Sequence, residues 1–137
     1  MRIVFDSNVY LAAAKRNSYS DLWIGRSQPN GPYQLFMSPE ILLEVRSKLE
    51  NKFGRSAEQS AQFIEMVMLY AVLVHPRRKV EGVLHDADDH KVLECALEAK
   101  AHVIISADRG LLKLKEFEDI KVAHSSMLKY WFPELSS

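Results

Sequence analysis

Four carboxylates occupy positions at which an α/β protein commonly places a functional site. Asp6 and Asp108 each follow a short apolar run. Glu44 interrupts an apolar helical run, and Asp89 lies in an acidic stretch just before another. Carboxylates that converge raise one another's pKa, so such a set needs a cation to offset its charge. Oxygen ligands without a supporting cysteine pair favour Mg²⁺ or Mn²⁺ over zinc, so the four acids predict a divalent-cation site if the fold gathers them.

Each of these acids also has an ordinary structural explanation. Asp6 and Asp108 suit the N-cap of a following helix, because a short side-chain oxygen can accept from the first free backbone N–H groups. The helix that carries Glu44 is expected to begin after Ser38. Glu44 stands four residues before Lys48, a spacing that gives an exposed helical ion pair worth about 0.3 kcal/mol. Taken singly, none of the three positions decides between structure and chemistry.

Residues 85–90 form the densest acidic stretch and lead into a helical pattern. Asp89 precedes the apolar residues of that pattern by three, four and seven positions, so it is expected at the edge of the face turned toward the sheet. Asp86 and Asp88 are explained by a solvated acidic first turn, which the helix dipole favours. The spacing therefore favours Asp89 over Asp88 as the inward acid.

Short apolar runs alternate with helical spacing along the chain. The runs predict strands at residues 3–5, 34–37, 71–74, 103–106 and 120–123. The stretches between them are long enough for helices, which predicts parallel β-α-β units with helices on both faces of the sheet. The fold class is therefore α/β. Ligands of such sheets bind outside the carboxyl ends of the strands, where two of the four acids are expected.

Size and composition fit a single domain over residues 1–137, since 47% of the residues are hydrophobic and 26% are charged. Lys and Arg together number 18, and Asp and Glu together number 18, which excludes a global positive field that would attract nucleic acid.

Cys95 is expected to pack in the core. His85 and His90 are five positions apart, a poor spacing for zinc, and are interpreted as polar neighbours. No run suits a signal peptide or a membrane span, which predicts a cytoplasmic protein.

The motifs, in this order, resemble those of the PIN-domain family, and in particular the PIN-type (VapC-like) toxin ribonucleases of toxin-antitoxin pairs. Residues 4–9 resemble the family's opening strand with its Asp-x-Asn motif, and residues 38–44 resemble its second motif, which ends in a glutamate. Residues 88–96 are similar to the third motif and residues 104–108 to the fourth. The likeness spans nearly the whole chain. Ser106 stands where the family often has threonine.

The resemblance implies a three-layer α/β/α fold with a mostly parallel sheet and the metal-dependent hydrolysis of RNA. Mg²⁺ or Mn²⁺ would be the cofactor, and the partners would be an RNA substrate, a cognate antitoxin and further copies of the chain in a homodimer or higher oligomer. Carried over position by position, it assigns the catalytic and metal-holding acids as Asp6, Glu44, Asp89 and Asp108, with Asn8 and Ser106 as polar support.

An acidic site repels phosphate unless cations flank it. Basic residues near the motifs are therefore candidates for substrate contacts, although most surface lysines and arginines are simply solvated. These candidates are Lys15, Arg16, Arg26, Lys91 and Arg109.

Two other functions fit part of the pattern. Phosphatase and phospho-acceptor domains also place aspartates at strand ends, but Asn8 departs from the Asp-x-Asp pattern of the phosphatases. A non-catalytic PIN-fold module that binds RNA or protein would keep the fold, but it gives no reason for the presence of all four acids.

Overall fold

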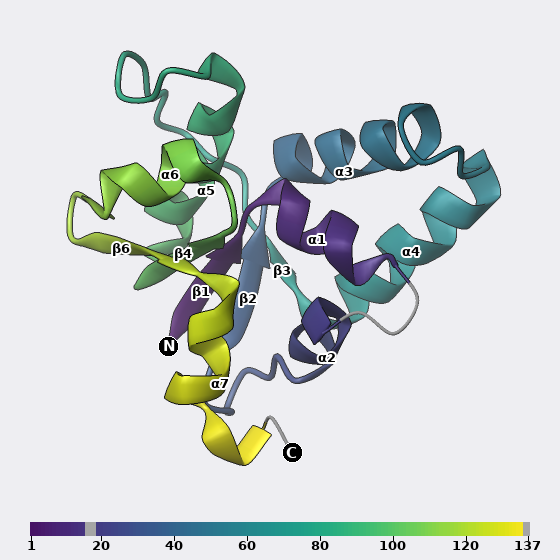
Figure 1. Ribbon diagram of the computed structural model, residues 1–137, viewed down its shortest axis with the longest axis horizontal. Helices are drawn as coiled ribbons and strands as arrows, with labels where there is room; N and C mark the ends of the chain where they lie inside the picture. Colours follow the sequence, from purple (N-terminus) through teal and green to yellow (C-terminus); the bar gives the residue numbers. More distant parts are fainter. Residues whose placement is uncertain (16–18, 136–137) are drawn as a thin grey trace.

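The computed structural model describes residues 1–15 and 19–135, apart from the side chains of residues 19 and 20 (Figure 1). The strands are β1 (Arg2–Phe5), β2 (Gln34–Met37), β3 (Val72–Leu73), β4 (Val103–Ser106), β5 (Glu116–Phe117) and β6 (Ile120–His124). The α-helices are α1 (Ser7–Ala13), α2 (Tyr19–Gly25), α3 (Pro39–Asn51), α4 (Ala57–Tyr70), α5 (His90–Ala99), α6 (Arg109–Leu114) and α7 (Leu128–Trp131). Short 3₁₀ segments are η1 (Ala87–Asp89), η2 (Ser125–Met127) and η3 (Pro133–Leu135).

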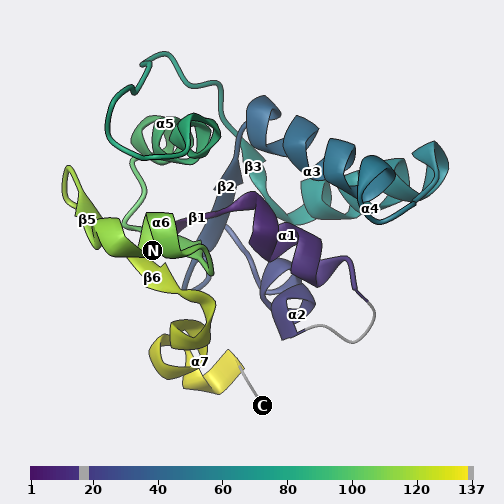
Figure 2. The ribbon, with the colours of Figure 1, turned by 45° about the horizontal axis from the view of Figure 1, so that its top comes forward.

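The described residues form one six-stranded sheet with the strand order β3-β2-β1-β4-β6-β5. All neighbouring strands run parallel except β5, which pairs antiparallel with β6. Figure 2 shows α5 on one side of the strands and α1 with α2 on the other. This three-layer α/β/α arrangement confirms the predicted fold class. It places β1 and β4 side by side at the centre of the sheet, so the carboxyl ends of these two strands meet.

Five of the six strands in the described residues form where the sequence predicts them, and β5 was not predicted. β2 and β4 have the predicted bounds, while β1 and β6 are each one residue longer. β3 has only two of the four predicted residues. Both residues of β3 are exposed and β3 lies at one edge of the sheet, so neither burial nor a second neighbouring strand stabilises a longer strand.

The two longest helices begin at N-caps that their sequences supply. The Ser38 side chain accepts a hydrogen bond from the backbone N–H of Ile41 at the start of α3, where proline occupies the first helical position. Ser56 and Gln59 form a reciprocal capping box at the start of α4. The cap at Ser38 fixes the phase of α3, and therefore the direction in which Glu44 points.

The core contains large side chains on both sides of the sheet. Cys95 is fully buried among them, which confirms its predicted packing role. At the end of the molecule opposite the acids, Tyr33 and Phe132 pack with ring centroids 5.0 Å apart. Tyr130 points outward and is 67% exposed, so the aromatic residues of the C-terminal segment divide between core and surface.

Within the described ranges, we find no helix with the length and apolarity to cross a bilayer.

Candidate active site

The centre of the site is a pair of side chains on the two central strands. β1 and β4 pair in parallel with Phe5 opposite Ile105, so the residues that follow them leave the sheet side by side. Ser106 Oγ donates a hydrogen bond to Asp6 Oδ2 at 2.9 Å and accepts one from the backbone N–H of Asp108, also at 2.9 Å. Residues 100 positions apart in sequence are thereby joined by one hydroxyl.

Asp6 is a buried carboxylate whose capping role is small. It occupies the N-cap position of α1, yet in the described part of the chain its side chain accepts no capping hydrogen bond from that helix. Only 2% of the residue is exposed. Burial raises the pKa of the Asp6 carboxyl, the hydrogen bond from Ser106 offsets part of this, and the charges on Glu44 and Asp108 raise the pKa further. A carboxylate in this environment favours either a proton or a nearby cation.

Glu44 brings the second carboxylate to the site from α3. Its Oε1 accepts a hydrogen bond from Ser7 Oγ at 3.0 Å, which connects it to the start of α1. Two ammonium groups contact it, Lys48 Nζ at 2.8 Å from Oε1 and Lys91 Nζ at 2.6 Å from Oε2. Burial alone would raise the pKa of Glu44, but the two lysines outweigh it and hold the pKa below its usual range.

The pair of Glu44 and Lys48 predicted from helix spacing is present, but its setting is not that of an ordinary exposed pair. Burial alone would lower the pKa of the Lys48 ammonium, whereas its hydrogen bond and charge interaction with Glu44, together with the charges of Asp6 and Asp89, raise it. Lys48 is therefore a cation of the acidic site as well as a helix-surface residue.

Asp108 combines two roles. Its Oδ2 accepts a hydrogen bond from the backbone N–H of Leu111 at 3.0 Å, so it caps α6 as its position suggested. Its charge also raises the pKa of both Asp6 and Asp89. The cap fixes the Asp108 side chain beside the carboxyl end of β4, facing the other acids.

Asp89 and Asp88 have different surroundings although they are adjacent. Asp89 is half-buried, and burial together with the charges on Asp108, Asp6, Asp86 and Glu44 raises its pKa to about 6. Asp88 is exposed and lines a separate hollow with Glu40 and Lys79. Asp86 caps the 3₁₀ turn η1 by accepting from the backbone N–H of Asp88. The inward acid is thus the one that helix periodicity favours.

The loop before α5 is held by a histidine with a structural role. His90 is buried, and its Nε2 accepts hydrogen bonds from the backbone N–H groups of Val83 and Leu84 at 3.2 and 3.0 Å. His85 is exposed. The acceptor role leaves the proton of a neutral His90 imidazole on Nδ1, and it fixes the loop that leads to Asp89.

The four acids suit a divalent cation by chemistry and by charge. They supply hard oxygen ligands, and the charges of neighbouring acids raise the pKa of Asp6 and of Asp89. Over the part of the chain that the structure describes, no three acidic, histidine or cysteine side chains lie close enough to ligate one ion as they stand. The ammonium groups of Lys48 and Lys91 instead supply the positive charge next to Glu44.

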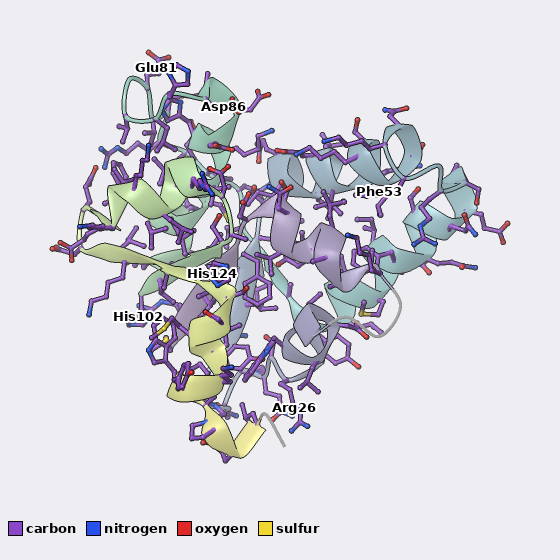
Figure 3. The ribbon with its side chains drawn as sticks, viewed as in Figure 1. Arg26, Phe53, Glu81, Asp86, His102 and His124 are labelled. Atoms are coloured by element: carbon purple, nitrogen blue, oxygen red, sulfur yellow. The ribbon has the colours of Figure 1, made fainter. Side chains whose placement is uncertain are left out.

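The structure separates the other candidate residues. Lys91 contacts the site directly, and Arg109 is exposed next to Asp108 at the start of α6. Arg26 is labelled in Figure 3 near the C-terminal segment, at the end of the molecule away from Asp86, so the substrate contact expected of Arg26 does not fit its position.

Three further candidates lie at or beyond the margin of the site. Asn8 is exposed on α1 and lines a hollow together with Lys15 and Lys48. It therefore faces this hollow and is not enclosed beside the carboxylates as Ser106 is. Arg16, another candidate, lies outside the described residues.

Sequence reasoning assigned no chemistry to two residues that contact the acids. Ser7 contacts Glu44 and lies 3.5 Å from Asp6 Oδ1, and Lys48 forms part of the charge balance. A serine directly after a strand-end acid was a usable signal for Ser7. Nothing in the sequence distinguishes Lys48 from an ordinary helical ion-pair partner.

Comparisons with known proteins agree with this architecture. A solved structure described as VapBC2 from Rickettsia felis bound to a DNA fragment from its promoter superposes with a TM-score of 0.62 and 12% sequence identity, covering 90% of this chain and 98% of the other. At this identity the likeness shows the fold alone. No curated protein sequence gives a significant match. A model of the PIN-domain family matches residues 2–110, which include all four acids. The chain therefore belongs to the PIN-domain family.

Proposed function

We propose that this protein is a metal-dependent ribonuclease that hydrolyses phosphodiester bonds of RNA. The observation that carries the proposal is that the charges of neighbouring acids raise the pKa of Asp6 and of Asp89. Burial and the charges of the other three raise the pKa of Asp89 to about 6. A fold that needed only stability would gain nothing from placing these four like charges in one region.

We assign Asp6, Glu44, Asp89 and Asp108 as the residues that would hold Mg²⁺ or Mn²⁺. When bound, such an ion activates a water and neutralises the charge that builds on the phosphate. In the hydrolysis, an oxygen of water would bond to phosphorus, one proton of that water would go to a base, the bond from phosphorus to the leaving ribose oxygen would break, and that oxygen would take up a proton from solvent to become a hydroxyl.

The chain's own residues supply the rest of the chemistry. One of the four acids would accept the proton of the attacking water through an oxygen that does not bind the ion. Ser106 positions Asp6 through the 2.9 Å hydrogen bond. Lys91 lies beside Glu44 and is free to turn toward a phosphate once a metal ion balances that carboxylate.

The direct test is cleavage of a labelled single-stranded RNA by the purified protein with Mg²⁺, with Mn²⁺ and with EDTA. We expect cleavage with either ion and none with EDTA, restored when the ion is supplied in excess. A product pattern that is the same with EDTA would contradict metal-dependent catalysis. RNA that stays intact under all conditions, while the protein binds it, would favour the non-catalytic module.

We also propose that the protein acts in the cytoplasm as a toxin held by an antitoxin, and that it self-associates. Exposed apolar side chains on α4 and β3 support a protein partner, since Leu69 is 78% exposed and Val72 and Leu73 are 36% and 37% exposed. Leu69 also lines a hollow of about 560 Å³ with Met66 and Met68.

Light scattering is expected to give at least twice the 15.7 kDa chain mass for the wild type, and a lower mass for Leu69→Lys. Ala61→Lys, which adds a lysine at an exposed residue of the same helix outside the lining of this hollow, is the matched control. A wild-type mass equal to one chain would contradict self-association.

A further inference from the structure

The polar hollow that Asn8 lines lies next to the acids, between α1 and the C-terminal end of α3. It has a volume of about 190 Å³. Asn8 lines it from α1 and Lys15 from the turn after α1. Lys48 lines it from the last turns of α3, and Lys52 and Phe53 line it from the residues directly after α3. Figure 3 labels Phe53 below the end of α3, toward α1.

The hollow concentrates positive charge in a protein whose formal net charge is zero. Lys15 and Lys52 contribute two ammonium groups to its lining, and a third, that of Lys48, is paired with Glu44. The two walls are fastened together below them, because the Arg55 guanidinium donates to the carbonyl oxygen of Ala14 at 3.4 Å. This lining suits a polyanion such as a nucleic-acid backbone.

An exposed aromatic ring adds a second kind of contact. Phe53 is 44% exposed although it is a large apolar side chain, and Lys15 Nζ lies 6.0 Å from the centre of its ring. Lysines combined with an accessible aromatic face are the usual means by which proteins hold single-stranded nucleic acid, because each base can stack on the ring while its phosphate pairs with a cation.

Lys48 joins this hollow to the acidic site. It lines the hollow and at the same time contacts Glu44 Oε1 at 2.8 Å. A strand whose phosphate lies at the four acids would therefore have a neighbouring nucleotide within reach of the hollow. A duplex would not fit this arrangement, because its bases are stacked on each other and cannot reach Phe53.

We propose that the hollow binds one nucleotide of single-stranded RNA next to the bond that is cut, with its base on Phe53 and its phosphate between Lys15 and Lys52. The proposal rests on the ribonuclease function above and names the form of its substrate. It makes Phe53 and the two lysines binding residues that select single strands and set the position of the cut.

The test measures binding without metal, so that it does not depend on cleavage. Fluorescence anisotropy of a labelled 12-nucleotide oligouridylate in EDTA should show about tenfold weaker binding for Phe53→Leu, in line with the loss of one stacked base. Phe53→Trp should bind as the wild type does, because it keeps an aromatic face. Lys15→Gln with Lys52→Gln should also reduce the slope of log affinity against log salt by about 0.7, because the two lysines hold the same phosphate.

The chain offers a matched control on the opposite end of the molecule. Lys129 Nζ lies 5.2 Å from the ring centre of Tyr130, which is 67% exposed. Lys129→Gln and Tyr130→Leu remove the same kinds of group and should leave binding and its salt slope unchanged. Equal effects of the two sets, or no loss with Phe53→Leu, would overturn the proposal, and so would a wild type that does not bind the oligonucleotide.

The outcomes separate this proposal from the nuclease function. If the wild type binds through Phe53 but never cuts RNA with Mn²⁺, the hollow stands and the nuclease function fails. If the wild type cuts RNA while the Phe53 and lysine variants bind and cut in the same way, the proposed binding role of the hollow is wrong and the nuclease function stands.

Melting temperatures of all variants should stay within about 2 °C of the wild type, because the substituted side chains are on the surface.

Discussion

Asp6→Asn is expected to lower metal-dependent RNA cleavage by about a hundredfold or more and, at the same time, to raise the melting temperature. The loss of activity follows because a bound metal ion is worth several kcal/mol to the transition state, and about 1.4 kcal/mol corresponds to each factor of ten. The neutral amide keeps the shape of the side chain and can still accept a hydrogen bond from Ser106, but it no longer attracts a cation.

The gain in stability has a separate cause. Burial and the charges on Glu44 and Asp108 raise the pKa of Asp6, so the ionised carboxylate lowers the free energy of unfolding at neutral pH. Removing that charge should raise the melting temperature, with about 4 °C for each kcal/mol gained in a domain of this size. Opposite signs for activity and stability exclude unfolding as the reason for the lost activity.

The control for this prediction is Asp88→Asn, which removes an equal charge from an exposed aspartate one residue before Asp89. We expect it to leave both cleavage and melting temperature near the wild-type values. Initial rates on a single-stranded RNA and a calorimetric scan give the two quantities. If Asp6→Asn keeps its cleavage rate, the assignment of Asp6 is wrong.

The metal-free protein is expected to lose stability as the pH rises from about 4 to 7, and a divalent ion is expected to restore it. The pKa of Asp89 is about 6 in the fold against an ordinary value of 3.8. A carboxyl whose pKa is raised on folding contributes stability that is complete below its ordinary pKa and is lost as the pH passes through the folded value. Asp6 acts in the same direction. Glu44, whose pKa is lowered, acts in the opposite direction, below its ordinary value of 4.5.

Addition of Mn²⁺ at pH 7 should raise the melting temperature, because an ion present at a hundred times its dissociation constant adds about 2.7 kcal/mol to the free energy of unfolding. At pH 4 the same addition should have little effect, since protons then compete for the acids. Thermal scans in EDTA and in Mn²⁺ across this range provide the measurement.

Two variants sharpen the result. Asp89→Asn should flatten the pH dependence between 4 and 6 and weaken the effect of Mn²⁺, whereas Asp88→Asn should leave both unchanged. A wild type whose melting temperature does not respond to Mn²⁺ at pH 7 would show that the four acids do not gather an ion. That result would remove the basis for the assigned metal ligands.

The sheet could be predicted closely where the sequence sets clear limits. β2 follows a turn-rich segment and ends at the Ser38 cap, and β4 ends at Ser106, so both have their predicted bounds. β3 is shorter than predicted because an exposed edge strand depends on pairing with one neighbour only. α3 continues to Asn51 because packing on α4 stabilises the helix more than its last residues do.

The site could be anticipated to a different extent for each residue. Parallel neighbouring strands carry Asp6 and Ser106 to the same edge, and helix periodicity selects Asp89 over Asp88. The contact of Lys91 with Glu44 could not be foreseen, because it depends on the packing of α5 against α3. A long, flexible side chain takes the rotamer that its tertiary neighbours allow, and spacing within one helix does not reveal those neighbours.

The position of β1 between β2 and β4 also affects how the protein is made. During synthesis Asp6 leaves the ribosome before the strand that ends at Ser106 and holds its hydrogen-bond partner. Until β4 has left the ribosomal exit tunnel, the nascent chain has β1 but not its partner β4. The pairing of two strands so far apart in sequence is also slow compared with local helix formation. The centre of the site is therefore completed only after this strand has been translated.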